Sequence, residues 1–379
     1  MDVVIAGAGV GGLALARGLA GHRSLVLEKA AAPRSGGSAV TVFSNGAAAL
    51  AGIGAPLGEL GGRIDTMRFH TAAGEVLFSV DLTVMARRTG FPVATIPRQR
   101  LISHLTAGLA PGTVAYDREV TTVDVREDDV TVTDGRGDRH DARLLVGADG
   151  HRSVVRRAVL SDAPAKDCGW TTWQGLTPAL PELAEGATGI CVVGKAGLCG
   201  LMPAGEGLLQ WWFDIHQPLD GPPAAALADR FAGYGRHVSA LLGEIRDEDL
   251  EYFRHVVHVV PDRWGTGAAT LLGDAAHVFP PSQAQGANQA LEDAWLLSQA
   301  LRTGGDDIDL PSTLRRYEAR RAPRVRKVSR MAARETTNRP AGFLSRKLTN
   351  LVPPAVAGRA YTALIRSWSS VLHDKTLPQ

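Results

Sequence analysis

Residues 2–30, DVVIAGAGVGGLALARGLAGHRSLVLEKA, decide how the first part of the chain folds. A short apolar run ends in glycines, a segment with helical spacing follows, and a second apolar run comes after it. This pattern predicts a strand at Val3–Ala6, a glycine turn, a helix over about Gly11–Ala20 and a second strand at Ser24–Glu28. A strand–helix–strand unit of this kind is typical of a parallel α/β sheet.

The glycine turn has the spacing of a dinucleotide-binding loop. Gly7, Gly9 and Gly12 fit G-x-G-x-x-G, in which the first allows the tight turn, the second lets the backbone approach a pyrophosphate, and the third lets the helix pack on the strand. Glu28 follows at the end of the second strand, where a carboxylate can accept from ribose hydroxyls. We therefore predict dinucleotide binding over a merely structural turn, although this motif does not separate NAD from FAD.

Composition describes an ordinary globular protein of 379 residues, with 45% hydrophobic and 21% charged residues. No apolar run is long enough for a transmembrane helix, and the start of the chain lacks the features of a signal peptide, so we expect a cytoplasmic protein. Cys168, Cys191 and Cys199 have no metal-type spacing, and their odd number argues against a disulfide framework. No metal site is predicted.

The net charge of +2 is unevenly distributed. Residues 311–347 hold twelve Lys or Arg and two Glu, so the rest of the chain is net negative. A solvated helix face explains such a run, and a docking surface for an anionic cofactor or partner is the alternative. Nucleic acid is not expected, because the run has almost no interleaved aromatic residues for base stacking.

A second polar loop lies far along the sequence, in LLGDAAHVFPPSQAQGANQALEDA at residues 271–294. Asp274 ends a short apolar run, and a helix is predicted from about Gly286 to Leu301. A carboxylate and a helix N-terminus aimed at one place suit a polar, anionic ligand. A third segment, LLVGADGHRSVVRRAV at residues 144–159, combines a buried strand with an Asp-Gly turn.

These three segments, in this order, resemble the FAD-dependent aromatic hydroxylases. These are the single-component flavoprotein monooxygenases typified by p-hydroxybenzoate hydroxylase and salicylate hydroxylase. The resemblance spans about residues 1–335. It implies an α/β fold with a Rossmann-like FAD-binding domain of the glutathione-reductase type, an inserted mixed β-sheet domain for substrate, and C-terminal helices. The expected boundaries are 1–67, 98–165 and 262–337 for the FAD domain, 68–97 and 166–261 for the substrate domain, and 338–379 for a helical tail.

The resemblance also assigns cofactor-binding roles to individual residues. The ADP half of FAD would contact Gly7, Gly9, Gly12 and Glu28, with Lys29 beside the adenosine. Arg98 in IPRQRL would contact the flavin side, and the Val120 backbone would meet the adenine, unless Val120 is simply a strand core residue. The ribityl hydroxyls would donate to Asp274, and the pyrimidine edge would face the backbone N–H groups of Gly286, Ala287 and Asn288.

Five further positions have an expected role or departure. Asp149 would belong to a fingerprint for FAD and the nicotinamide cofactor, or would cap the following helix, and Arg156 would help to hold the reductant or this segment. The carbonyl of Pro281 would face the flavin edge where oxygen reacts. His277 is expected to pack or hydrogen-bond behind the loop and not to act as a base. Ala284 departs from the glycine usual there, and we expect a slightly different loop path.

The reaction implied is the insertion of one atom of O2 into an aromatic or other electron-rich small molecule through a C4a-hydroperoxyflavin, with NADPH or NADH as reductant. A natural-product tailoring step would fit such an enzyme, working as a monomer or homodimer. A flavin-dependent reductase, oxidase or halogenase on the same fold, or a non-redox FAD-binding protein, is the alternative.

Candidate pocket residues, any of which could be plain core, are Trp173, Cys199, Met202, Trp211, Phe213 and Phe279. The sequence does not single out an acid or base; His216, His237 and Tyr234 are candidates.

Overall fold

The computed structural model describes residues 1–33, 37–178, 180–303, 308–334 and 351–374. Its N-terminal unit forms as predicted, with β1 at Asp2–Ala6, α1 at Val10–Gly18 and β2 at Arg23–Leu27. Strands β1 and β2 are parallel and in register from Asp2 with Arg23 to Ala6 with Leu27. Helix α1 is apolar on nearly all sides because it is buried between this sheet and α10 (Gly286–Thr303).

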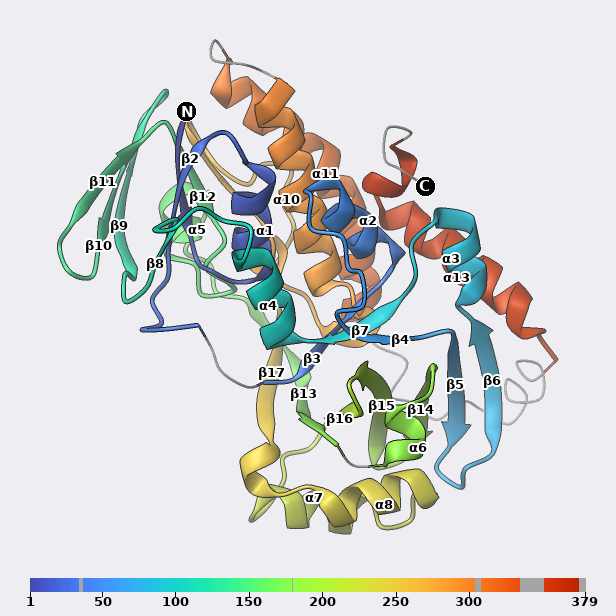
Figure 1. Cartoon of the computed structure of the whole chain (residues 1–379). Coiled ribbons are helices and arrows are strands. Elements are labelled where there is room, and N and C mark those ends of the chain that lie inside the picture. The colour runs from blue at the N-terminus through green and yellow to red at the C-terminus, as the bar shows by residue number, and fades with distance from the viewer. Residues whose placement is uncertain (34–36, 179, 304–307, 335–350, 375–379) are drawn as a thin grey trace.

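The complete parallel sheet has five strands and confirms the predicted Rossmann-like fold class (Figure 1). Its order is β18-β12-β1-β2-β8, with β8 at Val114–Ala115, β12 at Leu144–Gly147 and β18 at Ala269–Leu271. The chain thus returns to the same sheet from three distant parts of the sequence. The carboxyl ends of β1, β12 and β18 lead directly into the three segments that carry the motifs.

Two small antiparallel sheets extend this half of the molecule. One is a meander of β9 (Val120–Val125), β10 (Val130–Asp134) and β11 (Arg139–Ala142). The other has the order β3-β7-β4, with bounds Ala39–Val42, Ala94–Pro97 and Gly62–Arg63. In Figure 1 this second sheet lies between the parallel sheet and the larger sheet below it.

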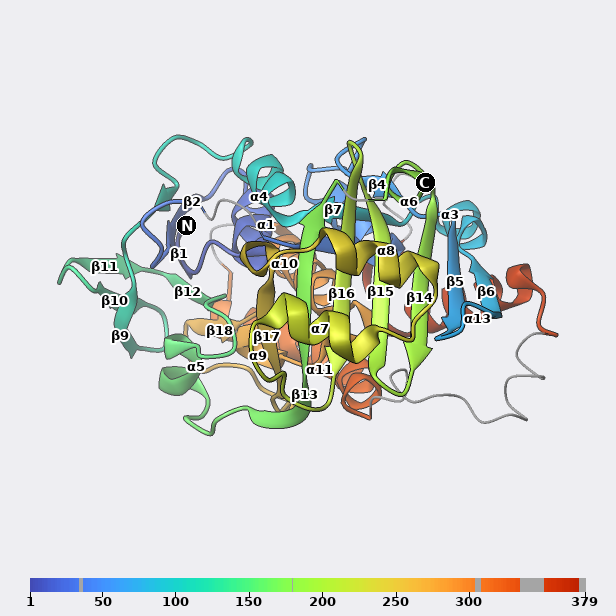
Figure 2. The same cartoon turned by 90° about the horizontal axis from the view of Figure 1, so that it is seen from below.

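The larger sheet has seven strands in the order β17-β13-β16-β15-β14-β5-β6. All neighbours are antiparallel except β14 and β5. The strands are β17 (Glu251–Val257), β13 (Lys166–Thr177), β16 (Leu208–Ile215), β15 (Gly197–Gly205), β14 (Thr188–Gly194), β5 (Thr66–Thr71) and β6 (Val76–Asp81). Helices α7 (Pro223–Phe231) and α8 (Arg236–Glu244) cover one face, as Figure 2 shows. The other face is directed at the half that contains the parallel sheet.

Helices complete the core around the parallel sheet. These are α2 (Ser44–Gly52), α4 (Arg98–Thr106), α5 (Val154–Val159), α9 (Asp274–His277) and α11 (Leu310–Ala333). Near the C-terminus, α13 (Pro354–Trp368) packs beside β6 and α3 (Thr83–Thr89), and the 3-10 turn η3 (Val371–His373) touches α2 and α10. Within the described ranges, no helix has the length and apolarity needed to span a membrane.

Candidate active site

The glycine loop between β1 and α1 leaves space for a ligand at one glycine only. Gly7 has φ +101°, and a Cβ there would lie 2.5 Å from the Ala148 carbonyl oxygen. A Cβ on Gly12 would lie 2.0 Å from the Gly7 carbonyl oxygen. At Gly9, which precedes α1, no protein atom lies within 4 Å of an added Cβ, and no side chain caps the helix. Gly7 and Gly12 therefore serve the fold, while Gly9 leaves the helix N-terminus open to an anion.

Glu28 sits where the second strand meets the glycine loop. Its carboxylate accepts from the backbone N–H of Ala8 at 2.7 Å and from that of Ala30 at 2.9 Å. These bonds fix the carboxylate beside the loop, and its half-buried position leaves it able to accept from a hydroxyl as well. Lys29, the next residue, is exposed. The residues present thus fit the ribose and pyrophosphate of a dinucleotide.

Asp149 contributes to capping α5, whose N-cap residue is Ser153, and its contact with a cofactor stays a prediction. Its Oδ2 accepts from the backbone N–H groups of Val154 at 2.7 Å and Val155 at 3.3 Å, at the start of α5. Burial raises the pKa of this carboxyl, against the hydrogen bonds that lower it. Its Oδ1 is buried without a partner among the described residues, so the carboxylate has a second acceptor to offer.

Arg156 is buried and connects two of the motif segments. Its Nη1 donates to the carbonyls of Ala275 at 3.0 Å and Ala276 at 2.9 Å, in α9. Burial lowers the pKa of the guanidinium. Arg156 therefore fixes α5 against the segment that begins with Asp274, and a contact with the reductant stays a prediction.

The Asp274 loop is held from behind while its carboxylate stays exposed. The backbone N–H of Gly273 donates to Asp293 Oδ2 at 2.9 Å, and the same oxygen lies 2.6 Å from His277 Nε2. His277 is fully buried and its ring lies against Trp264 at 5.3 Å. These contacts confirm the packing and hydrogen-bonding role expected of His277.

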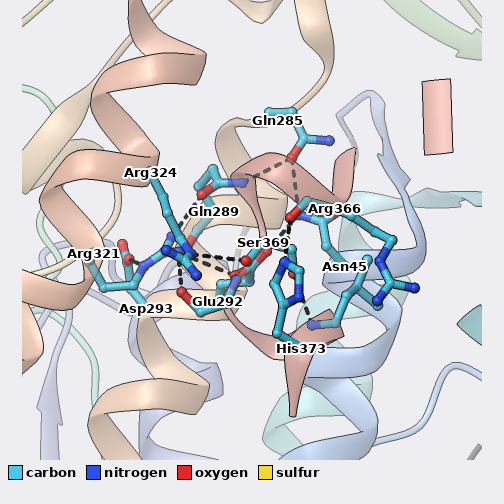
Figure 3. A network of polar contacts seen from close by, with 12 residues as sticks. Asn45, Gln285, Gln289, Glu292, Asp293, Arg321, Arg324, Arg366, Ser369 and His373 are labelled. Carbon is cyan, nitrogen blue, oxygen red and sulfur yellow. Dashed lines mark hydrogen bonds and ion pairs between the residues drawn. The ribbon is translucent and has the colours of Figure 1, made fainter. Parts of the chain in front are cut away.

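Behind this loop lies a buried charged network that the sequence analysis missed (Figure 3). Arg321 of α11 binds Asp293 Oδ1 through Nε at 2.6 Å and Glu292 Oε2 through Nη1 at 3.2 Å. Glu292 also accepts from Asn45 of α2 at 2.9 Å and from the backbone N–H of Ser370 at 2.5 Å. Burial alone would raise the pKa of Asp293, but Arg321 and His277 hold it below its usual range. The signal was available: adjacent Glu and Asp inside an otherwise apolar helical segment.

The loop from Pro281 to Ala284 forms the 3-10 turn η2 (Pro281–Gln283). The Pro281 carbonyl accepts from the Ala284 N–H at 2.6 Å, so one of its two lone pairs closes the turn. Ala284 has φ +48° and ψ +32°, the left-handed conformation that favours glycine. The alanine is therefore strained at this position, and a loop path that differs from the one usual in the family stays a prediction.

Replacing Ala284 by glycine should stabilise the protein by about 0.5–1 kcal/mol. Relief of the left-handed strain, about 1–2 kcal/mol, exceeds the extra entropy that glycine gives the unfolded chain. Chemical denaturation of the FAD-free protein measures the difference. Gly207→Ala, at φ +71° with open space around it, is the matched converse and should destabilise. A loss of stability in Ala284→Gly would contradict the strained conformation.

Helix α10 begins at Gly286, directly after this turn. The N–H groups of its first turn have no acceptor within the helix, as at any helix start. The Asn288 side chain is not part of a ligand surface, because Oδ1 accepts from the Phe43 N–H at 2.9 Å and Nδ2 donates to the carbonyls of Thr41 and Ala284. Asn288 thus fixes β3 to the helix start, and only backbone groups of residues 286–288 are available to a flavin.

Two further predicted cofactor contacts, Arg98 and Val120, begin α4 and β9. Arg98 begins α4, donates its backbone N–H to the Ser38 carbonyl, and places its guanidinium 5.9 Å from the centre of the Phe253 ring in β17. Arg98 thereby joins the two halves of the molecule. The Val120 side chain is buried in the core, while its backbone lies at the edge of the β9–β11 meander. A contact between that backbone and adenine stays a prediction.

The structure corrects the predicted substrate pocket. Alternate residues of a strand point to opposite faces, and Cys199, Trp211 and Phe213 point toward α7 and α8. They form a second core with Leu227 and Phe231 of α7. Trp173, which pairs with Phe213, lies on this same far face. The remaining two candidates, Met202 and Phe279, are buried in the core that includes the parallel sheet.

The inward face of the sheet instead carries the other set of strand residues. In register across β13, β16 and β15 these are Thr172, Gln174, Leu176, Asp214, Trp212, Gln210, Leu198, Gly200 and Met202. Gln174 donates to Ser38 Oγ at 2.5 Å, and Gln210 accepts from the Ala39 N–H. Trp212 lies over Gly200, where an added Cβ would be 2.1 Å from the indole ring. A one-residue error in face assignment thus accounts for the misplaced candidates.

The three acid–base candidates do not meet at this face. Tyr234 donates to the Gly197 carbonyl at 2.7 Å within the far core, and His237 belongs to α8. His216 is exposed, with its ring 6.5 Å from that of Trp170.

Comparison with known proteins agrees with this arrangement. Residues 1–332 match the family described as FAD binding domain. The chain is 33% identical over 351 residues to a 3-amino-4-hydroxybenzoate 2-monooxygenase of Streptomyces platensis, with 86% of each chain covered. It is 31% identical over 335 residues to an aurachin C monooxygenase/isomerase of Stigmatella aurantiaca, again covering 86% of each. A solved structure of Klebsiella pneumoniae HpxO with FAD and uric acid superposes with a TM-score of 0.81 at 27% identity, covering 97% and 93% of the two chains.

Proposed function

This chain belongs to the FAD binding domain family of flavoprotein monooxygenases, and from that premise we propose that it hydroxylates an uncharged, electron-rich aromatic ring bearing a hydroxyl or amino group. Its cofactor is FAD. The proposed reductant is NADPH or NADH. When bound, FAD accepts a hydride from the reductant and then activates O2.

The protein's part in this chemistry is to bind and orient. We assign the pyrophosphate to the open N-terminus of α1 at Gly9, a ribose to Glu28 and the ribityl chain to Asp274. Reduced flavin carries negative charge at its pyrimidine end, and the N-terminal dipole of α10 would stabilise that charge. The Pro281 carbonyl retains one lone pair for the flavin edge. Packing of the seven-stranded sheet against this half would exclude water from the reacting ring.

The absence of Lys and Arg from the inward face of β13, β15 and β16 carries the choice of substrate. None of the nine inward residues of β13, β15 and β16 is Lys or Arg. Asp214, the single charged group among them, is bonded to the Thr172 hydroxyl. A carboxylate on the substrate would therefore meet no cation from these strands and would lose its hydration without compensation. Trp212, Leu198 and Met202 offer apolar contact to an aromatic ring, and Gln210 supplies a polar group.

A matched pair of compounds tests this proposal. The compound 3-amino-4-hydroxybenzoate and its decarboxylated form, 2-aminophenol, differ only in the carboxylate. We expect 2-aminophenol to be used with a kcat/KM at least about tenfold higher, because a desolvated and unpaired carboxylate costs more than 1.4 kcal/mol. Substrate-dependent NAD(P)H oxidation under labelled O2, with mass spectrometry of the product, is the measurement. A preference for the carboxylate would overturn the substrate class.

The labelled oxygen also separates the alternatives on this fold. One labelled atom in the product supports monooxygenation. NAD(P)H consumption without labelled product would indicate a reductase or an oxidase, and chloride-dependent product formation would indicate a halogenase. A protein that binds FAD but never consumes NAD(P)H with either compound would be a non-redox FAD-binding protein.

A further inference from the structure

A buried polar cluster crosses three strands on the inward face of the large sheet. The Thr172 hydroxyl of β13 lies within hydrogen-bond distance of Asp214 Oδ1 in β16 and 2.7 Å from His255 Nε2 in β17. All three side chains are at least nine-tenths buried. The His255 ring also lies against Trp170, with 4.2 Å between ring centres.

The hydrogen-bond pattern determines the tautomer of His255 when Asp214 is ionised. An ionised carboxylate only accepts, so the single Thr172 hydroxyl proton is then directed at Asp214. Thr172 Oγ1 must then accept from His255, which places the ring proton on Nε2 and leaves a lone pair on Nδ1. Burial lowers the pKa of His255 to about 4, so the ring is neutral at neutral pH. Among the described residues, the hydrogen bond given for the His255 ring is the one between Nε2 and Thr172.

His255 lies between two contacts with the FAD-binding half. Two residues before it on the same face, Phe253 meets the Arg98 guanidinium at 5.9 Å. Three residues after it, the His258 N–H donates to the Val278 carbonyl at 2.9 Å, at the start of the loop that contains Pro281. One strand residue spans about 3.3 Å, so His255 is within about 10 Å of both contacts along β17. In Figure 1, β17 runs from the level of α7 up to the FAD-binding half.

We propose that Nδ1 of His255 accepts a hydrogen bond from the substrate's hydroxyl group, with Thr172 and Asp214 holding the ring in the required tautomer. This inference rests on the proposed function, since it assigns a residue to the proposed aromatic substrate. A neutral acceptor at this group raises the electron density of the ring without full deprotonation. Oxygen transfer to an aromatic carbon is favoured by that electron density. His255 is then a catalytic residue, and Thr172 is a positioning residue.

The test uses 2-aminophenol and its methyl ether, 2-methoxyaniline, in which a methoxy group replaces the hydroxyl donor and the amino group is kept. Each is titrated into the FAD-loaded protein, and the flavin absorbance change gives the Kd. Wild type should bind 2-aminophenol about tenfold more tightly, the order expected for one hydrogen bond. In His255→Phe the ratio of the two Kd values should fall to about one. Thr172→Val, which is close in shape and removes only the positioning hydroxyl, should also lower the ratio.

The control variant is His216→Phe. His216 also lies near the Trp170 ring, but it is exposed and has no place in the cluster. The ratio in this variant should equal that of wild type. The inference is overturned if wild type shows no preference for 2-aminophenol, or if the preference survives in His255→Phe. Since the titration needs no turnover, it can fail or succeed independently of the labelled-oxygen assay.

Discussion

Replacing Arg321 by methionine should lower the free energy of unfolding by about 3–5 kcal/mol, the cost of leaving buried charge without its partner. The guanidinium is completely buried and binds both Glu292 and Asp293. Without it, two adjacent carboxylates remain in the core. Methionine keeps much of the side-chain volume, so the effect would come from charge and not from a cavity. Urea denaturation of the FAD-free protein measures the change.

The same substitution should also weaken FAD binding. Asp293 holds the Gly273 N–H and His277 with the oxygen that does not face Arg321, so a shift of Asp293 would move the loop that presents Asp274. We expect the Kd for FAD, followed by flavin fluorescence, to rise at least about tenfold. The control is Arg320→Met, because Arg320 is the neighbouring residue of α11 and is exposed. Equal stabilities of the two variants would show that the network contributes little.

The network explains why part of the fold could not be predicted from the sequence. A helical tail is expected at residues 338–379, yet the backbone N–H of Ser370 donates to Glu292 in the core. Residues 338–350 lie outside the described ranges, and the boundaries of the domains stay predictions. Local periodicity carries no information about a pairing between residues 78 positions apart. The hydrogen bond between Ser370 and Glu292 could be found only from the three-dimensional structure.

The candidate site was predictable where one backbone motif determines its geometry. The glycine loop, the Asp-Gly turn and the start of α10 form as expected, because glycine positions and helix starts are local properties. The substrate face was not predictable in the same way. Trp211 and Trp212 are adjacent and equally aromatic, and only the register of β16 against its neighbours decides which one points inward. The sequence therefore predicted the strand but assigned its faces incorrectly.

The second large expected effect is a loss of FAD affinity caused by substitutions in the glycine loop. Two substitutions are compared, which differ in whether the added Cβ would overlap a protein atom. Gly9→Ala should leave the free energy of unfolding of the FAD-free protein within about 0.5 kcal/mol of wild type, since φ is −75° and no protein atom lies within 4 Å of the new Cβ. Gly12→Ala should destabilise by at least about 1–3 kcal/mol, since its Cβ would overlap the Gly7 carbonyl. Both variants should bind FAD at least about 100-fold more weakly, Gly9→Ala because the methyl group would occupy the space assigned to the pyrophosphate.

Measuring stability and FAD affinity on the same samples separates the two causes. Gly243→Ala is the control, because Gly243 lies in α8 with open space around it and far from the loop in sequence. Alanine there should stabilise the helix by about 0.5–1 kcal/mol and leave the Kd for FAD unchanged. If Gly9→Ala bound FAD with wild-type affinity, the pyrophosphate could not lie at the N-terminus of α1. Because its stability would be unaltered, a loss of affinity in Gly9→Ala could come only from a ligand that needs the space in front of that helix.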